Sequence, residues 1–465
     1  MSSIQICGVI IVLFMIPLIG VLSGSYVKNS EDFESAGGKG STGLVSGLML
    51  GAMLGGSYTI GTAQLAYTQG ISAFWYTLSN SLFCLLYAFM YIKPFRHPRA
   101  PTLLGIIRLE YGSHIGLAVS LLVCVATFVS LIAQLIASSA VLPVIFSGIT
   151  VPLAVVLTAT LMLAYIVFGG AVAAGQIGKV KIVLLFVTVL VGTYIILKET
   201  GLRTLWDTLD HNTYFDLFAN GVGKEASKAL SVILGAVTTQ VYMQAAMAGR
   251  SDKASHRGVL ISAFLVPPVG LVSVLIGMFM RVNHPALENA KDVFPQFILL
   301  YMPELLGGIV MGTILLAIIG SGAAATMEIS TIVHRDIIAP RTHRFDTPKA
   351  ALLFKRMCIV FLLAGGCLLS TGVLGDMVLA FSSASIGLRS ATMFAPLMGA
   401  MFFSGKIDRR WVLVSVIVGT VLALLFSLWD VLPIDGVGAG CLGSTICCLF
   451  GAVSQARTHR QNSCH

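Results

Sequence analysis

The chain has 465 residues, of which 56% are hydrophobic and only 11% are charged. Soluble globular domains carry about 25% charged residues, so the composition excludes an ordinary water-soluble protein. The formal net charge of +9 does not indicate a nucleic-acid partner, because the basic residues are spread over short segments and form no single patch or stripe. Lipid bilayer is therefore the expected surrounding of most of the chain.

Stretches that are poor in charged residues follow one another along the whole chain. Each fits the length of about 20 residues that a helix needs to span a bilayer, and each is continuously apolar, which favours helices over alternating barrel strands. Two stretches fit two helices each, and nine fit one; in chain order the eleven are 1–28, 39–93, 110–179, 181–198, 228–250, 257–281, 304–328, 356–376, 376–406, 410–430 and 435–457. We predict an all-α polytopic membrane protein with about thirteen transmembrane helices.

Loop charge predicts how these helices are oriented. The first helix lacks the basic start and cleavage site of a secretory signal, so we expect it to be retained, although a cleaved leader is the alternative. With the amino terminus outside the cell, 22 Lys and Arg residues fall in inner segments, 6 in outer ones and one inside a span. The positive-inside rule then predicts a plasma or inner membrane protein with a cytoplasmic carboxyl terminus.

The chain is expected to form one transmembrane transporter domain. The echo of Leu50-Gly51-Ala52 by Leu234-Gly235-Ala236 suggests that helices 2–6 and 7–11 form two five-helix repeats of opposite topology. The predicted segments are a first helix and loop (1–43), the first repeat (44–198), the second repeat (228–404), two accessory helices (411–453) and a cytoplasmic tail (454–465). No phosphate-binding loop, nucleophile motif or metal-spaced cluster indicates an ATP-driven pump or an enzyme. The nine cysteines lie mostly in apolar spans, where packing is the expected role.

Interruptions of the apolar helices mark the expected binding site, since unwound backbone exposes carbonyl and amide groups. The second helix is rich in glycine around Gly55 and Gly56, which predicts either a break or close packing against a neighbour. The seventh carries polar residues at 238–240 and the ninth at 320–331. Hydroxyls there can also bond their own helix.

Two charged residues fall inside predicted helices. Arg389 is costly at that depth, so it is expected either to bind a substrate carboxylate or to pair with Glu328 or Asp376. Glu328 lies seven residues, two helical turns, beyond Ser321 and is a candidate proton or gating site. Its alternative role is to pair with Arg389 or Arg335.

A set of motifs in order resembles the sodium:solute symporter family, whose members share a leucine-transporter-like core. The resemblance covers about residues 32–411. The motifs are Phe33 to Gly40, Ile60-Gly61-Thr62-Ala63, Ala66-Tyr67, Gly70, Gly169-Gly170, Gln240, Gln244, Ala248-Gly249-Arg250, Ala254, Gly258, Ser330-Thr331 and Asp336-Ile337.

The resemblance implies alternating access driven by sodium and no other cofactor. It places sodium ligands at Gly51, Leu54, Ala317 and Ser321, while Gly320 stands where a second hydroxyl is expected. Weak sodium binding or proton coupling is therefore an alternative. A second cation site is not expected, because the family's Thr-Asp pair is Ile177-Gly178 here and the following Gln is Lys181.

The resemblance also implies substrate contacts. These project onto Tyr58, Thr77, Asn80 and Thr239, with Gln240 and Arg389 as further candidates. The glutamate that binds sugar in relatives is Thr77 here, so a small polar or carboxylate-bearing solute is expected and a sugar is not favoured. A transporter-like sensor that signals to a separate partner chain fits the same helices.

Overall fold

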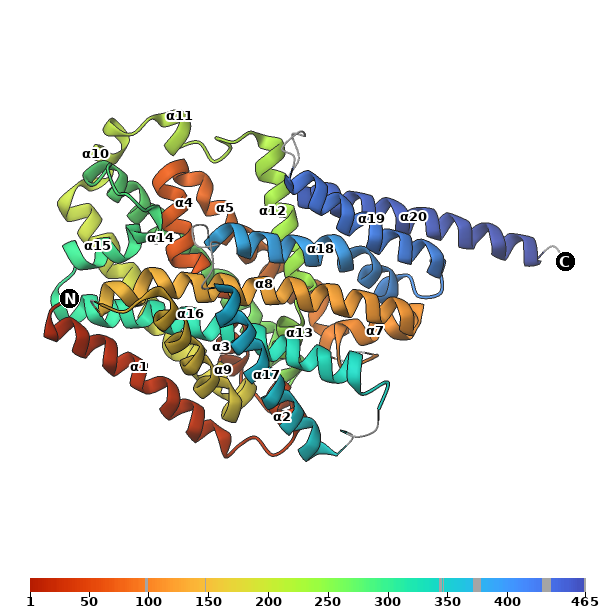
Figure 1. Cartoon of the computed structure of the whole chain (residues 1–465). Helices are drawn as coiled ribbons and strands as arrows, with labels where there is room; N and C mark the ends of the chain where they lie inside the picture. Colours follow the sequence, from red (N-terminus) through yellow and green to blue (C-terminus); the bar gives the residue numbers. More distant parts are fainter. Residues whose placement is uncertain are drawn as a thin grey trace.

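The computed structural model describes residues 1–96, 99–146, 148–342, 345, 347–370, 378–428 and 436–463. Throughout these ranges the secondary structure is helical, without a strand (Figure 1). Large apolar side chains such as Phe14, Leu190 and Leu368 are exposed on the outside of the helices. Since water would not tolerate so much exposed apolar surface, this is the surface of a protein that faces lipid. The predicted all-α polytopic architecture is confirmed.

The first half of the chain builds the lower-numbered helices of the bundle. Short π-helical or 3₁₀ turns at 36–38, 57–61, 70–74 and 87–91 separate several of them. Their bounds are α1 (Ser3–Gly24), α2 (Ser30–Ser35), α3 (Thr42–Met53), α4 (Thr62–Gln69), α5 (Trp75–Leu86), α6 (Ile92–Arg96), α7 (Leu103–Tyr111), α8 (Ser113–Ile145) and α9 (Val151–Glu199).

The second half continues with short helices on one end of the molecule and then long ones. Further turns lie at 290–292 and 333–338. The bounds are α10 (Gly201–Thr208), α11 (His211–Tyr214), α12 (Val222–Val237), α13 (Gln240–Ala248), α14 (Asp252–Asn283), α15 (Val293–Tyr301), α16 (Glu304–Ile332), α17 (Pro348–Ser370), α18 (Val378–Phe402), α19 (Arg409–Leu428) and α20 (Gly436–Ser463).

Length and composition give fewer spans than the sequence predicts. Within the described ranges, nine helices are long and apolar enough to cross a bilayer, or ten if the bent pair α12 and α13 is one span. Two of the nine contain a glycine with a positive φ: Gly170 inside α9 (φ 48°) and Gly70 between α4 and α5 (φ 64°). A side chain at either would collide with Phe33 or Tyr214. The count of thirteen stays a prediction.

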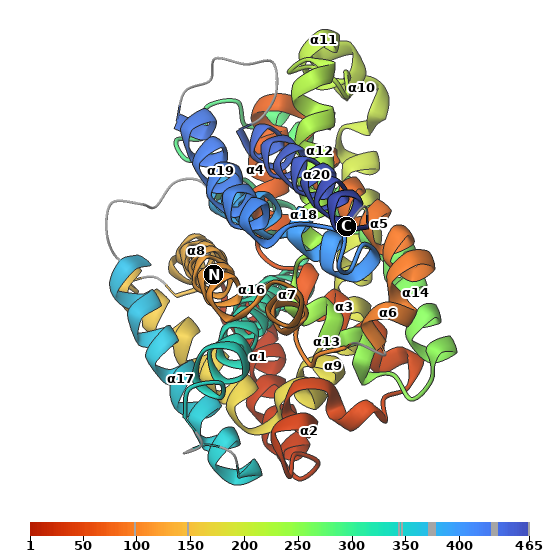
Figure 2. The ribbon, with the colours of Figure 1, turned by 90° about the vertical axis from the view of Figure 1, so that its right-hand side faces the viewer.

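The centre of the bundle is built by α3, α8, α9 and α16. Glycines let α3 and α9 approach closely, since a Cβ on Gly47 would lie 2.1 Å from the Gly175 carbonyl oxygen. Helix α16 is buried along almost its whole length and packs against α1, α8 and α9. Helices α19 and α20 lie side by side at the edge, where α20 extends beyond the bundle (Figures 1 and 2). The end of α3 therefore lies in the buried centre of the bundle.

Candidate functional site

The glycine-rich second span is broken where the sequence predicts a break. Helix α3 ends at Met53, and Gly55 N–H donates to the Met53 carbonyl (2.8 Å) instead of to that of Gly51. Tyr58 N–H donates to Gly55 (3.1 Å), so the Leu54 carbonyl also has no helical partner. The glycines also serve close packing, because a Cβ on Gly55 would lie 2.7 Å from Ser321 Oγ. The glycine run therefore both breaks the helix and allows close packing.

The freed carbonyl groups face a lysine from α9. Lys181 Nζ donates to the Gly51 and Leu54 carbonyl oxygens, at 2.7 Å each, and its side chain is fully buried. Ser321 Oγ also donates to Gly51 O, at 3.4 Å. Three of the four predicted sodium ligands thus surround one point, and an amine lies there. Lys181 was not predicted to belong to this site.

The seventh span is broken in the predicted polar stretch. Helices α12 and α13 meet at an angle of 53°, and Thr238 and Thr239 hydroxyls both donate to the Gly235 carbonyl. The first N–H of α13, that of Gln240, donates to Glu328 Oε1 (3.1 Å). A carboxylate at a helix amino terminus is favourable because the N–H groups there carry partial positive charge.

The two intramembrane charges form an ion pair. Arg389 Nη1 lies 3.5 Å from Glu328 Oε1, and both side chains are buried. The expected pairing of Arg389 with Glu328 is therefore present, while Asp376, the other expected partner, lies outside the described residues. Arg389 also borders a small polar cavity that lies between the two helix breaks.

A small polar cavity of about 60 Å³ lies between the two broken helices. It is bordered by hydroxyl, amide and guanidinium groups from six elements, which suit a small polar solute. The lining comprises Ala52, Met53, Ser57, Tyr58, Tyr76, Asn80, Ser130, Gln134, Ala236, Thr239, Tyr242, Ser321, Ser382, Ile386 and Arg389.

Four of the six predicted substrate residues meet in this cavity. Tyr58, Asn80, Thr239 and Arg389 line it, and the predicted sodium ligand Ser321 borders it as well. The other three predicted sodium ligands, Gly51, Leu54 and Ala317, are buried but do not border it.

The other two predicted substrate residues point elsewhere. Thr77 Oγ1 donates to Phe74 O (3.0 Å), and the Thr77 side chain packs where a Cβ on Gly270 of α14 would lie. Gln240 Oε1 accepts from the Leu103 N–H at the start of α7 (2.8 Å). The structure places neither side chain at the cavity.

Several lining residues were not predicted. Gln134 of α8 accepts from Gly56 N–H (3.0 Å) and so holds the first break in place. Tyr76 and Tyr242 contribute aromatic rings, and Tyr76 packs on Tyr58 with ring centres 5.0 Å apart. Tyr76 lies four residues before Asn80, so the two side chains share one face of α5. This spacing was the signal that could have predicted Tyr76.

A second cavity leads toward this site from one end of the protein. It measures about 300 Å³, and Tyr76 and Ile386 border both cavities and separate them. Glu225 and Lys228 of α12 lie on its wall, so this end carries charge as a water-filled entrance would.

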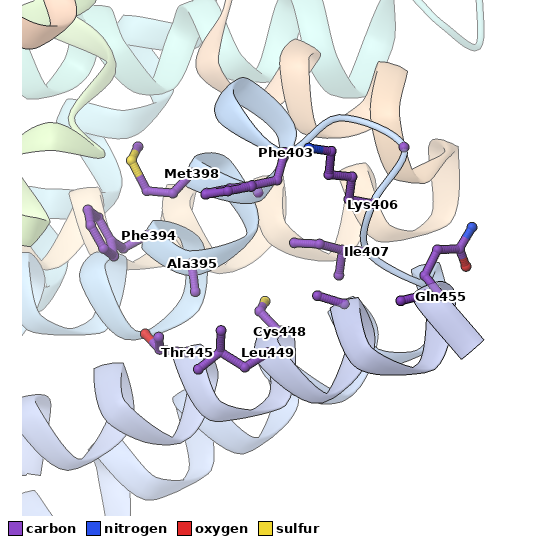
Figure 3. Close-up of a pocket in the computed structure, with 14 residues that line it drawn as sticks. Phe394, Ala395, Met398, Phe403, Lys406, Ile407, Thr445, Cys448, Leu449 and Gln455 are labelled. Atoms are coloured by element: carbon purple, nitrogen blue, oxygen red, sulfur yellow. The ribbon is translucent and has the colours of Figure 1, made fainter. Parts of the chain in front are cut away.

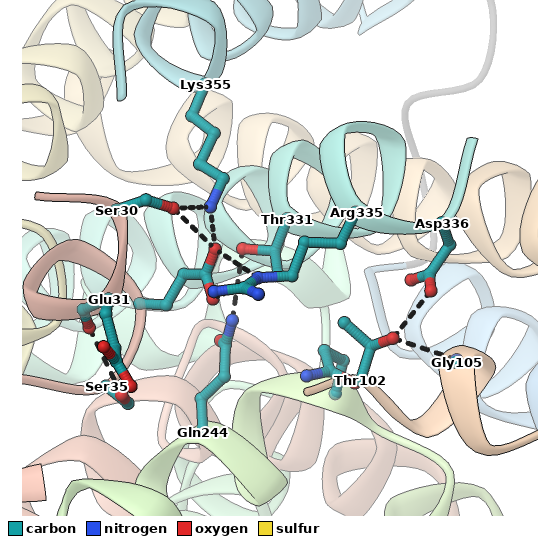
Figure 4. A network of polar contacts seen from close by, with 12 residues as sticks. Ser30, Glu31, Ser35, Thr102, Gly105, Gln244, Thr331, Arg335, Asp336 and Lys355 are labelled. Atoms are coloured by element: carbon teal, nitrogen blue, oxygen red, sulfur yellow. Dashed lines mark hydrogen bonds and ion pairs between the residues drawn. The ribbon is translucent and has the colours of Figure 1, made fainter. Parts of the chain in front are cut away.

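The opposite end is closed by charged and polar contacts (Figure 4). Arg335, after α16, donates from Nε to both Glu34 oxygens (3.0 and 2.8 Å), and the buried Lys355 of α17 contacts the same carboxylate. Gly40 N–H donates to the Ala248 carbonyl (2.7 Å), which ties the start of α3 to the end of α13. Access to the polar cavity is therefore tighter at this end.

A larger cavity, of about 440 Å³, lies apart from the breaks between α18 and α20 (Figure 3). Phe394, Met398, Ile407 and Leu449 point into it, and few polar groups border it. Such a lining cannot orient a polar solute by hydrogen bonds, so it is not the candidate site.

Two broken helices around a buried polar cavity define a secondary-transporter architecture. The model of the sodium:solute symporter family matches residues 35–419. The chain therefore belongs to the sodium:solute symporter family, a family of transporters.

Relatives and solved structures agree with this fold. The chain is 27% identical to the "uncharacterized symporter YwcA" of Bacillus subtilis (strain 168) over 197 residues, 41% of this chain and 38% of that protein, so the match spans well under half of the relative. A Na⁺-coupled sialic acid symporter, solved in a substrate-bound outward-open state, superposes with a TM-score of 0.82 at 17% identity over 98% of both chains. The nucleobase-cation-symport-1 transporter MHP1 gives 0.61 at 12% identity over 94% of this chain and 96% of its own.

Proposed function

We propose that this protein is a secondary symporter that carries a small polar or carboxylate-bearing solute across the cell membrane together with a cation. Family membership supports sodium as that cation. The observation that carries the proposal is the buried polar cavity between the two breaks, with an entrance at one end and ion pairs across the other. Neither catalysis nor a resident cofactor is part of it.

The solute is proposed to lie among Tyr58, Asn80, Thr239 and Tyr242, with Arg389 at one side. Arg389 Nη1 lies 3.5 Å from Glu328 Oε1. A guanidinium group has five N–H donors, so further donors of Arg389 are left for a substrate carboxylate. The present cavity of about 60 Å³ is smaller than typical ligand sites of roughly 300–1,000 Å³. Binding is therefore proposed to require movement of Tyr76 and Ile386.

The membrane orientation is proposed from charge. The end that carries Glu34, Arg335 and Lys355 is the cytoplasmic one if the amino terminus is outside, as the positive-inside rule predicts. The entrance beside Glu225 and Lys228 then opens to the outside. In this assignment the protein faces outward with its inner end closed.

Uptake into vesicles tests the proposal. A thermal-shift screen of small polar metabolites selects the solute, since a ligand raises the melting temperature of the state it binds. Purified protein in vesicles with an inward sodium gradient should then accumulate that solute above its outside concentration. Uptake that only equilibrates, with or without ion gradients, would contradict symport.

Two neighbouring residues of α5 provide a matched pair for the site. Asn80→Ala should weaken solute affinity at least about tenfold, a loss of about 1.4 kcal/mol, because Asn80 lines the cavity. Thr77→Ala should leave affinity unchanged, because Thr77 packs against Gly270. Equal effects of the two changes on affinity would place the solute elsewhere.

A further inference from the structure

A basic groove of about 580 Å³ lies at the closed end of the protein, between α6 and the start of α14. Lys93 of α6 and Lys253 and Arg257 of α14 line it, and all three side chains are exposed. We call these three residues the basic triad. Asp252, the acid in the described lining, accepts from Arg96 Nε (3.0 Å). Within the described parts of the chain the triad forms no ion pair, so the groove carries a net positive charge.

Hydrogen bonds show how the two segments that form this groove run. His256 Nδ1 donates to the Ala88 carbonyl oxygen (2.9 Å), and Ser81 Oγ donates to the Ala263 carbonyl oxygen (2.6 Å). Ser81 and Ala88 are seven residues apart, and so are His256 and Ala263. The segment from α5 to α6 therefore lies antiparallel to α14, and Figure 2 shows the three helices on the same flank of the bundle.

Exposed apolar side chains continue from the groove along both segments. On α14, Ile261 and Phe264 follow Arg257 at spacings of four and three residues, so they share its helix face. On α5, Leu86 and Leu82 are exposed one turn apart. Because the segments are antiparallel, both apolar rows run from the basic groove toward the middle of the molecule.

A positive pocket that continues into apolar rows matches the shape of a phospholipid. The acidic phosphate lies at the membrane surface, and the acyl chains run parallel to the helices. Basic pockets between membrane helices are known sites for lipid head groups. The amino terminus of α14 adds partial positive charge at the same place. The exposed Phe89 ring, 5.3 Å from the His256 ring between centres, forms one wall of the groove.

We propose that this groove binds an acidic phospholipid, with the phosphate among the basic triad and an acyl chain along Leu86 and Ile261. The inference goes beyond the proposed symport, because the lipid is a bound ligand and not the solute carried. Its phosphate links α6 to α14 beside the ion pair of Arg96 and Asp252. Binding should therefore stabilise the closed end.

Lipid binding to the purified full chain in detergent tests the proposal. Native mass spectrometry compares phosphatidylglycerol with phosphatidylcholine of the same acyl chains. The wild type should bind phosphatidylglycerol at least about tenfold more tightly, and this lipid should raise the melting temperature. Equal affinity for the two lipids would overturn the proposal.

A soluble phosphate ester separates a lipid site from a site for free anions. Glycerol 3-phosphate carries the same phosphate without acyl chains, so at the same concentration it should not raise the melting temperature. If it stabilises the protein as much as phosphatidylglycerol does, the apolar rows contribute nothing, and a lipid is not the ligand.

Variants of the basic triad test the charges. Lys93→Gln, Lys253→Gln and Arg257→Gln should each weaken phosphatidylglycerol binding about fivefold, and the triple variant about a hundredfold. Affinity for phosphatidylcholine should not change. Lys253→Arg keeps the positive charge and should bind phosphatidylglycerol as the wild type does. Full affinity in the triple variant would overturn the proposal.

A matched triple variant controls for general attraction between a basic protein and an acidic lipid. Lys406→Gln, Arg409→Gln and Arg410→Gln together remove the same charge from exposed residues at the start of α19. Phosphatidylglycerol affinity should stay at the wild-type value. Equal losses in the two triple variants would show that the acidic lipid does not bind at the groove.

Two further readouts keep the result distinct from other causes. Monodisperse gel filtration and a cooperative melt show that each variant is folded. A dimer in native mass spectra that is lost in the triad variant and excludes the lipid would assign the groove to a second copy of the chain and overturn the proposal. No solute is used in these measurements, so the lipid site and the proposed symport can fail independently.

Discussion

The two broken helices of this protein carry opposite charges at their breaks. The first break follows the carboxyl end of α3, and its freed carbonyl groups accept from Lys181. The second precedes the amino end of α13, and its freed N–H donates to Glu328. Each helix end thus attracts the charge that complements its dipole. A break in a membrane helix therefore attracts a positive charge where it frees carbonyl groups and a negative charge where it frees N–H groups.

The second difference is how each charge is paired. Glu328 pairs with Arg389, whereas Lys181 donates to two backbone carbonyl oxygens and forms no ion pair with an acid among the described residues. A paired charge keeps the second break fixed. At the first break the positive charge is held by the dipoles of backbone carbonyl groups, which are weaker partners than a carboxylate.

The largest expected effect comes from unpairing the second break. Glu328→Gln leaves Arg389 buried without its partner, so the free energy of unfolding should fall by about 3–5 kcal/mol. The melting temperature in detergent measures the change. Glu304→Gln, at the exposed start of α16, is the matched control and should have little effect.

Adding Arg389→Gln to Glu328→Gln should restore part of the lost stability, because no unpaired charge is then left. The melting temperatures of the single and double variants in detergent, measured side by side, check this. A double variant no more stable than Glu328→Gln would show that the unpaired guanidinium group is not the cause of the loss.

A smaller effect is expected from filling the first break. Gly55→Ala places a Cβ 2.7 Å from Gln134 Oε1 and Ser321 Oγ, so it should destabilise the protein by about 1–3 kcal/mol and disturb cation binding. Gly365→Ala is the control, because only the Phe128 ring tip lies near, at 3.6 Å. If Gly55→Ala is as stable as Gly365→Ala, the break after α3 does not pack against α8 and α16 as closely as these distances indicate.

The smallest effect is expected from hydroxyls that bond the backbone at each break. Thr238→Val removes the bond to the Gly235 carbonyl (2.7 Å), and Thr62→Val removes that to the Ser57 carbonyl (2.9 Å). Each should cost about 0.5–1.5 kcal/mol of stability. Chemical denaturation of the two variants in parallel measures the loss of stability at each break. A much larger loss for one variant would show that its break depends on the hydroxyl group.

Much of the site could be predicted from the sequence because it is local information. The glycines at 55 and 56 weaken a helix by themselves, and the polar residues at 238–240 interrupt an apolar run. Tyr58, Asn80 and Thr239 were predicted from the family resemblance, and they line the cavity. Thr77 and Gln240 do not line the cavity, since the direction of a side chain depends on which face of a helix its neighbours cover.

The composition and the interrupted apolar runs predict a helical membrane protein with broken helices, and the family resemblance predicts sodium ligands at the first break. The position of the Lys181 amine at this break depends on the tertiary structure. Lys181 is 130 residues from Gly51, and nothing near it in sequence indicates where its long side chain ends. The close packing of α3 on α9 brings the amine to the two carbonyl groups, because glycines at the contact let the backbones approach. Contacts of this kind arise from packing and carry no local pattern.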